Sequence, residues 1–214
     1  MISHENLELD VFPLFASPLI QIRVRENLDK VMSYANSQEF VVGSQTGNNG
    51  SQCSKDRRVL EKYSDIRDII MQYFCISSHE ILRYDGSFKM TTSWFTKVEQ
   101  GGSQFHFHKN SFYSGILYFG EYDNKNGGSL QFNNPLEQFP DYKIVPSEYY
   151  IGNCNEYGVY PIQNLLLFFP SYLSHRIDEY TGDKPRYSLA FNIVPIGEYG
   201  SNDSTYSTKW MHKC

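Results

Sequence analysis

The feature that most constrains the fold is a rhythm of short apolar runs and turns between residues 88 and 195. The runs are rich in aromatic and β-branched residues, with Gly, Asn, Asp and Pro between them. Such residues are enriched in strands, and such punctuation is typical of turns. The 17 Tyr and 15 Phe residues point the same way. The sequence therefore predicts a mainly β fold, whose expected strands lie at 88–100, 110–120, 129–135, 164–180 and 186–195.

The N-terminal third is expected to support this β core. We expect an edge strand within 8–25, a short helix that Asn27 caps, a loop at 42–55 and a long helix within 57–84, N-capped by Ser64. Residues 135–163 are expected to hold short strands and a loop that covers the functional site. The tail, 197–214, has no period and is expected to fray or dock loosely.

Many short strands with helices gathered at the N-terminal side favour a closed or double-sheet β architecture, a jelly roll being the obvious candidate. A chain of 214 residues fits one domain of this kind. We expect a single domain over 1–214, with helical support at about 1–85, a jelly-roll core at about 86–196 and a tail at 197–214.

Charge and cysteine usage exclude several classes. A net charge of −5 and a pI near 5.7 disfavour a broad nucleic-acid or anionic-lipid surface. No secretory signal and no membrane-length apolar run are visible, so the expected protein is soluble and cytoplasmic. The four widely spaced cysteines are expected to be free thiols. We assign no role to His4, His79 or His212.

The chemistry is expected around the stretch SQFHFHKNSFYSGILYFG. His106 and His108 stand two residues apart, so on an extended strand both side chains project from one face. His175 ends a second apolar run, and Arg186 follows eleven residues later. Two close histidines, a distant third and then an arginine form a recognisable order. The three histidines are the candidate metal ligands and catalytic residues.

Such a set suits non-haem iron. Iron(II) held by three protein groups on one face keeps open positions for cosubstrate and oxygen. The chain has no visible source of electrons, and a 2-oxo acid that chelates iron would supply them. The far carboxylate of that acid needs a partner. Arg186 can supply a two-pronged hydrogen bond, and Ser188 faces the same way on the strand.

From about Trp94 to Val194 the chain resembles the Fe(II)- and 2-oxoglutarate-dependent dioxygenases, in particular the prolyl-hydroxylase-like branch and small oxygenases of bacteria and phages. The family's HxD pair is matched by His106 and His108, and NLLLFFPSYLSH resembles its strand with the distal histidine. GGSLQF looks like its Gly-Gly hairpin. The resemblance implies a cupin-like double-stranded β-helix, with Fe(II) and 2-oxoglutarate as cofactors. It also implies that Arg186 and Tyr118 bind 2-oxoglutarate.

One departure concerns the second ligand, which is usually Asp or Glu in the family and is His108 here. Bacterial and phage relatives often have HxH, so we expect a three-histidine site. Coordination by Glu99 or Asn110 stays open, as does a degenerate site. Trp94 lies near enough to the histidine stretch to touch a ligand.

The expected function is a 2-oxoglutarate-dependent dioxygenase that hydroxylates an unidentified substrate and releases succinate and CO2. The partners are then 2-oxoglutarate, O2 and a small molecule or protein side chain, without a membrane or nucleic acid; a homodimer stays open. Two alternatives remain. One is a cupin-type three-histidine dioxygenase that needs no oxo acid, and the other is a non-catalytic jelly-roll binding module.

Overall fold

Two antiparallel sheets stacked face to face form the body of the molecule. The computed structural model describes residues 16–42, 50–136 and 145–208. The main sheet has seven strands in the order β1-β8-β5-β10-β4-β3-β2, and a smaller sheet has the order β7-β6-β9. The main sheet comprises β1 (Ile20–Arg23), β2 (Phe40–Val42), β3 (Ser51–Ser54), β4 (Ser87–Val98), β5 (Tyr113–Tyr118), β8 (Leu165–Pro170) and β10 (Arg186–Ile196). The smaller sheet comprises β6 (Leu130–Asn133), β7 (Glu156–Val159) and β9 (His175–Ile177).

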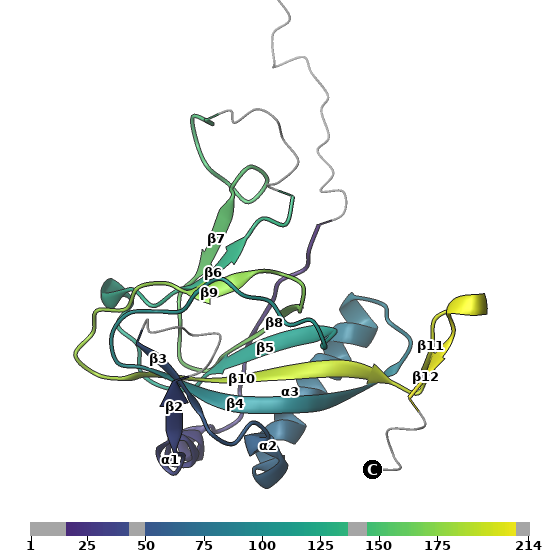
Figure 1. Cartoon of the computed structure of the whole chain (residues 1–214), viewed down its shortest axis with the longest axis horizontal. Coiled ribbons are helices and arrows are strands. Elements are labelled where there is room, and N and C mark those ends of the chain that lie inside the picture. Colours follow the sequence, from purple (N-terminus) through teal and green to yellow (C-terminus); the bar gives the residue numbers. More distant parts are fainter. Residues whose placement is uncertain (1–15, 43–49, 137–144, 209–214) are drawn as a thin grey trace, which may run out of the picture.

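The helices cover one face of the main sheet, and the small sheet covers the other (Figure 1). The helical elements are α1 (Asp29–Asn36), α2 (Val59–Lys62), α3 (Ser64–Ile76), a π-helical turn η2 (Ser77–Ile81) and two 3₁₀ turns, η3 (Asn124–Asn126) and η4 (Asn202–Ser204). The architecture is the mainly β jelly roll with flanking helices that the sequence predicts.

Strict alternation on the central strands divides the interior into two cores. On β10, Leu189, Phe191 and Ile193 pack in the core shared with the helices. The alternate residues Arg186, Ser188 and Asn192 therefore lie on the opposite face. β8 is buried on both faces, since Leu166 and Phe168 belong to the helix-side core and Leu167 and Phe169 to the core between the sheets. This alternation places polar side chains where the two sheets face each other.

The helix α3 is held by one apolar stripe. Ile66, Ile70 and Phe74 recur every four residues and are fully buried. The expected long helix is therefore correct over 64–76, but Leu60 lies in the separate α2. Ser64 is the first residue of α3 and not its N-cap; Tyr63 stands before it and makes no side-chain capping bond. The predicted N-cap at Asn27 is wrong, because α1 begins at Asp29 and its N-cap is Leu28, which makes no side-chain capping bond. Asn27 lies one residue earlier, where its Oδ1 accepts the Asp29 N–H at 2.8 Å.

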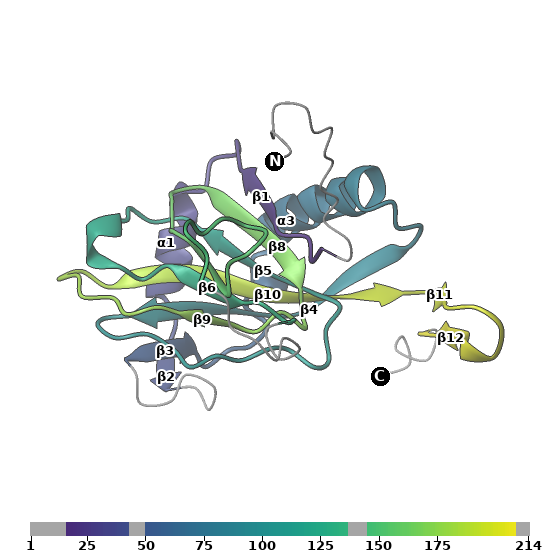
Figure 2. The ribbon, with the colours of Figure 1, turned by 90° about the horizontal axis from the view of Figure 1, so that it is seen from above.

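Two expected irregular segments contain strands. Within 42–55, residues 43–49 lie outside the described part, and Ser51–Ser54 form β3, which pairs with β4 through Cys53 and Thr96. The tail, 197–214, is expected to fray or dock loosely, and its residues 209–214 lie outside the described part. In the described part of the tail, β11 (Glu198–Tyr199) and β12 (Tyr206–Ser207) instead form a hairpin that projects beyond the end of β10 (Figure 2). Both strands are held by pairing with a partner, which the local sequence does not reveal.

The remaining predictions concern the edge strand, the cysteines and the membrane. β1 is an edge strand of the main sheet, as predicted. Cys53, Cys75 and Cys154 are free thiols, while Cys214, His4 and His212 lie outside the described residues. Within the part of the chain that the structure describes, no helix is both long and apolar enough to span a membrane.

Candidate functional site

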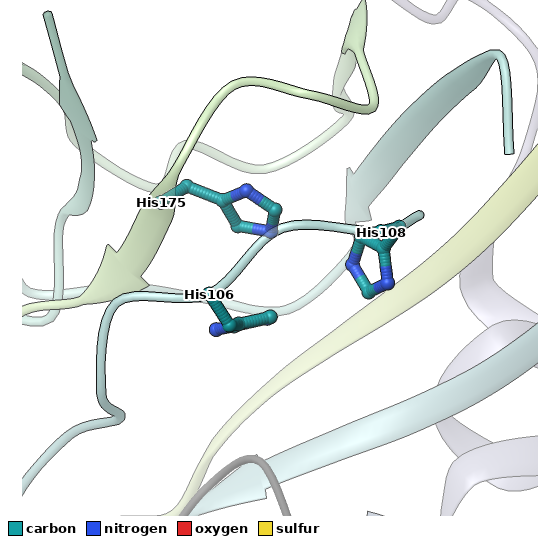
Figure 3. Close-up of side chains that lie close together, drawn as sticks. All are labelled: His106, His108 and His175. Carbon is teal, nitrogen blue, oxygen red and sulfur yellow. The ribbon is translucent and has the colours of Figure 1, made fainter. Parts of the chain in front are cut away.

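Three histidines converge between the two sheets. Each of His106, His108 and His175 offers a ring nitrogen, and these nitrogens all lie within 4.8 Å of one another. Figure 3 shows the rings of His106 and His108 rising from one segment and the ring of His175 from the beginning of β9. Such a set of close nitrogen donors, delivered from two backbone segments, can hold one divalent transition metal.

The backbone that carries the pair differs from the expected strand. His106 and His108 lie in an extended segment before β5 that makes only an isolated bridge, between His106 and His175. The His106 N–H donates to the His175 carbonyl at 3.0 Å, and the His175 N–H donates to the His106 carbonyl at 2.9 Å. The His108 N–H donates to the Ser171 carbonyl at 3.0 Å. The two-residue spacing still brings both rings together, with centroids 5.4 Å apart.

Local hydrogen bonds set the tautomers of two rings. Nδ1 of His106 lies 2.9 Å from the Gln104 carbonyl, and Nδ1 of His175 lies 2.8 Å from the Leu173 carbonyl. Because a carbonyl oxygen can only accept, each Nδ1 carries the hydrogen. Each Nε2 lone pair is then free, which is the usual arrangement of a metal-bound histidine.

The electrostatic setting keeps the rings neutral. Burial lowers the pKa of His106, lowers that of His108 to about 4 and lowers that of His175 to about 3. A second cause for His108 and His175 is the neighbouring His106, since one protonated ring disfavours another. Neutral imidazoles are the form that binds a metal, so the donor set fits Fe(II).

The buried guanidinium of Arg186 lies on the face of β10 that also carries Ser188. Arg186 is 3 % exposed, and its Nη2 donates to the Tyr118 hydroxyl at 3.2 Å. Its Nε and Nη1 are buried without a hydrogen-bond partner. Burial raises the pKa of Tyr118, which therefore keeps its proton, and that proton is free because the tyrosine oxygen accepts from Arg186. These unsatisfied donors fit the carboxylate of a 2-oxo acid.

The glycine pair of the expected hairpin makes room for this arginine. Gly127 and Gly128 adopt φ of +75° and +74°, a region that favours glycine. A Cβ on Gly128 would stand 3.0 Å from Cδ of Arg186, and a Cβ on Gly127 would stand 2.1 Å from the Glu179 carbonyl. The pair follows η3 and leads into β6, so the backbone of this turn passes directly over the arginine.

A cavity of about 310 Å³ lies beside the histidines, and neither Arg186 nor Tyr118 is among its lining residues. All three histidines line it, and so do Ser188 and Trp94. The hydroxyl of Ser188 has no hydrogen-bond partner among the described residues and stays available to a ligand. Glu99, one of the two alternative ligands, makes an ion pair with Lys97 at 2.5 Å and lies outside the histidine group. Asn110 lines a neighbouring cavity.

Several cavity residues were not singled out from the sequence. Ser51 and Cys53 belong to β3, and the hydroxyl of Ser51 is buried without a partner. Arg57 lines the cavity from the segment between β3 and α2, and Asn192 does so from β10. The alternation of RYSLAFNIVP could have identified Asn192, since it has the parity of Arg186 and Ser188. No sequence signal marks the other three.

Comparison with known proteins agrees with this geometry. Residues 92–192 match the model of a family described as "Putative 2OG-Fe(II) oxygenase". The matched segment contains the three histidines together with Tyr118, Arg186 and Ser188. A comparison with proteins of curated function finds no match.

Solved structures show the same fold at low identity. An oxidoreductase of the 2OG-Fe(II) oxygenase family from Burkholderia pseudomallei has a TM-score of 0.59 at 9% identity, over 82% of this chain and 84% of that one. A prolyl hydroxylase from Trichoplax adhaerens has a TM-score of 0.57 at 15% identity, over 82% of each chain. HygX from Streptomyces hygroscopicus, solved with nickel and 2-oxoglutarate bound, has a TM-score of 0.59 at 7% identity, over 84% of this chain and 83% of that one.

Proposed function

We propose that the chain is a 2-oxoglutarate-dependent iron oxygenase that hydroxylates a C–H bond of an organic substrate, and the family match over residues 92–192 supports this. In the overall reaction, substrate, 2-oxoglutarate and O2 give hydroxylated substrate, succinate and CO2. Iron and 2-oxoglutarate, when bound, supply the oxidising power that inserts one atom of O2 into the C–H bond. The residues of the chain hold and orient the reactants.

His106, His108 and His175 hold the iron in this proposal. Support comes from their converging ring nitrogens and from the Nδ1 hydrogen bonds that leave Nε2 of His106 and His175 free. The fixed tautomers orient two rings before metal arrives, which lowers the cost of assembling the site.

Arg186, Tyr118 and Ser188 hold 2-oxoglutarate. The observation that carries the proposal is the buried guanidinium of Arg186, whose Nε and Nη1 have no partner. A buried cation without an anion is costly, and a bidentate carboxylate would satisfy it. Tyr118 can donate its hydroxyl hydrogen to the same carboxylate, and Ser188, two residues after Arg186 on β10, lines the cavity.

The two other functions that the sequence left open lack this support. A three-histidine dioxygenase without an oxo acid, and a non-catalytic binding module, would both leave the guanidinium of Arg186 without its anion. The comparison also matches a family of oxygenases that use 2-oxoglutarate.

The test is anaerobic reconstitution with Fe(II) followed by 2-oxoglutarate, with the visible charge-transfer band of the chelate as readout. We expect the band in the wild type and in His79→Ala, whose histidine lies away from the triad. His175→Ala should lose iron and band together. Arg186→Ala should keep iron while 2-oxoglutarate binding weakens at least about a hundredfold, because a charge-assisted pair is lost.

Two results would contradict the proposal. Normal iron content in His175→Ala would remove this residue from the ligand set. Unchanged 2-oxoglutarate affinity in Arg186→Ala would show that the cosubstrate binds elsewhere, since no other residue can replace two lost donors without a measurable change.

A further inference from the structure

Arg57 lines the cavity together with the three histidines, whereas Arg186 is not among the lining residues. The Ser93 N–H of β4 donates to the Arg57 carbonyl at 2.8 Å, which fixes the arginine backbone beside Thr92 and Trp94. In the pairing of β10 with β4, Arg186 lies opposite Val98 and Asn192 opposite Thr92. Six residues of strand span about 20 Å. The backbone of Arg57 therefore lies on the order of 20 Å along the strands from that of Arg186, and of the two arginines only Arg57 lines the cavity.

Arg57 is exposed to solvent and has no carboxylate partner among the described residues. Three other cations of the same segment have carboxylate partners: Lys55 with Glu39 at 3.2 Å, Arg58 with Glu61 at 3.7 Å and Lys62 with Asp56 at 2.7 Å. Within residues 16–42, 50–136 and 145–208, Arg57 has no ion pair and no side-chain hydrogen bond. The one cation of the segment that lines the cavity is also the one without an acid.

Carboxylates are also missing from the cavity wall. Among the described residues that line this cavity there is no Asp or Glu. The two adjoining cavities around His108 likewise have none, and they contain Lys109. This is unexpected for a chain with 24 acidic residues and a net charge of −5. The region around Arg57, Lys109 and His108 is therefore positive on an acidic protein, and such a region attracts anions.

A hydroxyl donor lies in the same region. Nδ2 of Asn192 donates to Oγ1 of Thr92 at 3.0 Å, while Oδ1 of Asn192 accepts from Ser114 at 2.8 Å. Because the Thr92 oxygen already accepts, its hydrogen is left to donate to a ligand. A cation and a free hydroxyl donor together recognise an oxyanion.

From these observations we propose that the substrate is a small molecule with a carboxylate or phosphate group, which Arg57 binds while the rest of the molecule lies over Trp94 toward the histidines. The cavity of about 310 Å³ must also hold 2-oxoglutarate, which favours a small molecule. This inference rests on the proposed function, because it assumes that 2-oxoglutarate binds Arg186.

The experiment measures binding of matched anionic and neutral probes to the anaerobic protein loaded with Fe(II) and saturating 2-oxoglutarate. The probes are N-acetylglycine, N-acetylleucine and N-acetylphenylalanine, each beside its carboxamide, and O-phosphoserine beside serine. Trp94 lines the cavity, so its fluorescence reports binding in a Trp210→Phe background, which removes the second tryptophan. Calorimetry provides a second readout that does not depend on turnover.

We expect at least one anionic probe to bind about tenfold more tightly than its neutral partner. Arg57→Gln should abolish that preference and Arg57→Lys should restore part of it. The matched control is Arg58→Gln, which removes an exposed charge from the adjacent residue that already pairs with Glu61. This control should keep the wild-type preference.

Three outcomes overturn the proposal: equal binding of acids and amides, no binding of any probe, or an anion preference that survives in Arg57→Gln. A loss of 2-oxoglutarate affinity in Arg57→Gln would also overturn it, by assigning the arginine to the cosubstrate. Failure of the proposed function looks different, because the charge-transfer band would then be missing before any probe is added.

Discussion

Gly128 lies so close to Arg186 that a side chain at the glycine would press on the guanidinium arm, with Cβ 3.0 Å from Cδ. The absence of a side chain at Gly128 therefore helps to fix the position of the Arg186 side chain. On another side, Cζ of Arg186 lies 5.2 Å from the centroid of the Tyr118 ring. A turn residue with no polar side chain thereby determines where a carboxylate can bind.

The first prediction concerns this contact. Gly128→Ala should weaken 2-oxoglutarate binding about tenfold while iron is retained, because the displaced guanidinium no longer meets the carboxylate. The variant should also lose roughly 1 kcal/mol of unfolding free energy from the φ of +74°. The control is Gly197→Ala, which has φ of +98° and nothing within 4 Å of the added Cβ. It should lose stability but bind 2-oxoglutarate normally in the chelate titration.

The second prediction separates a ligand-binding hydroxyl from a structural one. Tyr118→Phe removes a donor to the cosubstrate and an acceptor from Arg186, so 2-oxoglutarate affinity should fall about tenfold. Tyr122→Phe is the matched control, because its ring packs on Tyr118 while its hydroxyl bonds only to backbone groups, including the Tyr187 carbonyl at 2.7 Å. The control should unfold at a lower temperature and show an unchanged binding curve. Equal affinities in the two variants would refute the role of Tyr118.

The third prediction concerns the charge of the metal centre. His108→Asp replaces a neutral ligand by an anionic one, so the site becomes one unit less positive. We expect the variant to retain Fe(II) and to bind the 2-oxoglutarate dianion at least about tenfold more weakly, since the electrostatic attraction is reduced. Anaerobic titration followed by metal analysis measures both effects. His108→Ala is the control and should lose iron; a variant with Asp that binds the dianion more tightly would contradict the argument.

The fourth prediction addresses the core beneath the site. The ring of Phe74 on α3 packs against the rings of Phe88, Tyr113 and Phe168, with centroids 5.1 to 5.5 Å apart. Phe74→Ala should lower the free energy of unfolding by about 3–5 kcal/mol, because the fully buried ring leaves a cavity. Urea denaturation measures the change. Ile76→Ala, on the same helix and 52 % exposed, should change stability by less than about 1 kcal/mol.

The sequence predicts what depends on periodicity. The alternation in RYSLAFNIVP assigns Arg186 and Ser188 to one face and Phe191 to the other, and in the structure Phe191 packs in the core shared with the helices. The two-residue spacing of His106 and His108 likewise brings the rings together, although their segment is not a regular strand. The identity of these residues as ligands stays a prediction.

What the sequence could not predict depends on long-range pairing. Ser51–Ser54 has the polar sequence SQCS, which does not favour a strand, and it is one because β4 supplies its hydrogen-bond partners. With β3 read as a loop, neither Ser51 nor Arg57 could be placed beside the histidines. The C-terminal hairpin was missed similarly, since the rings of Tyr199 and Tyr206 meet only after the chain has turned.

The backbone bridge between His106 and His175 has a thermodynamic consequence. Two of the three ring donors are gathered by main-chain hydrogen bonds that form when the sheets assemble, so the entropy of collecting them is lost during folding and not during metal uptake. Any substitution that loosens the pairing of this segment with β9 should therefore weaken metal affinity as well as stability, even when every ligand is intact. Metal affinity and the free energy of unfolding should therefore change in the same direction across variants that alter the pairing between the His106 segment and β9.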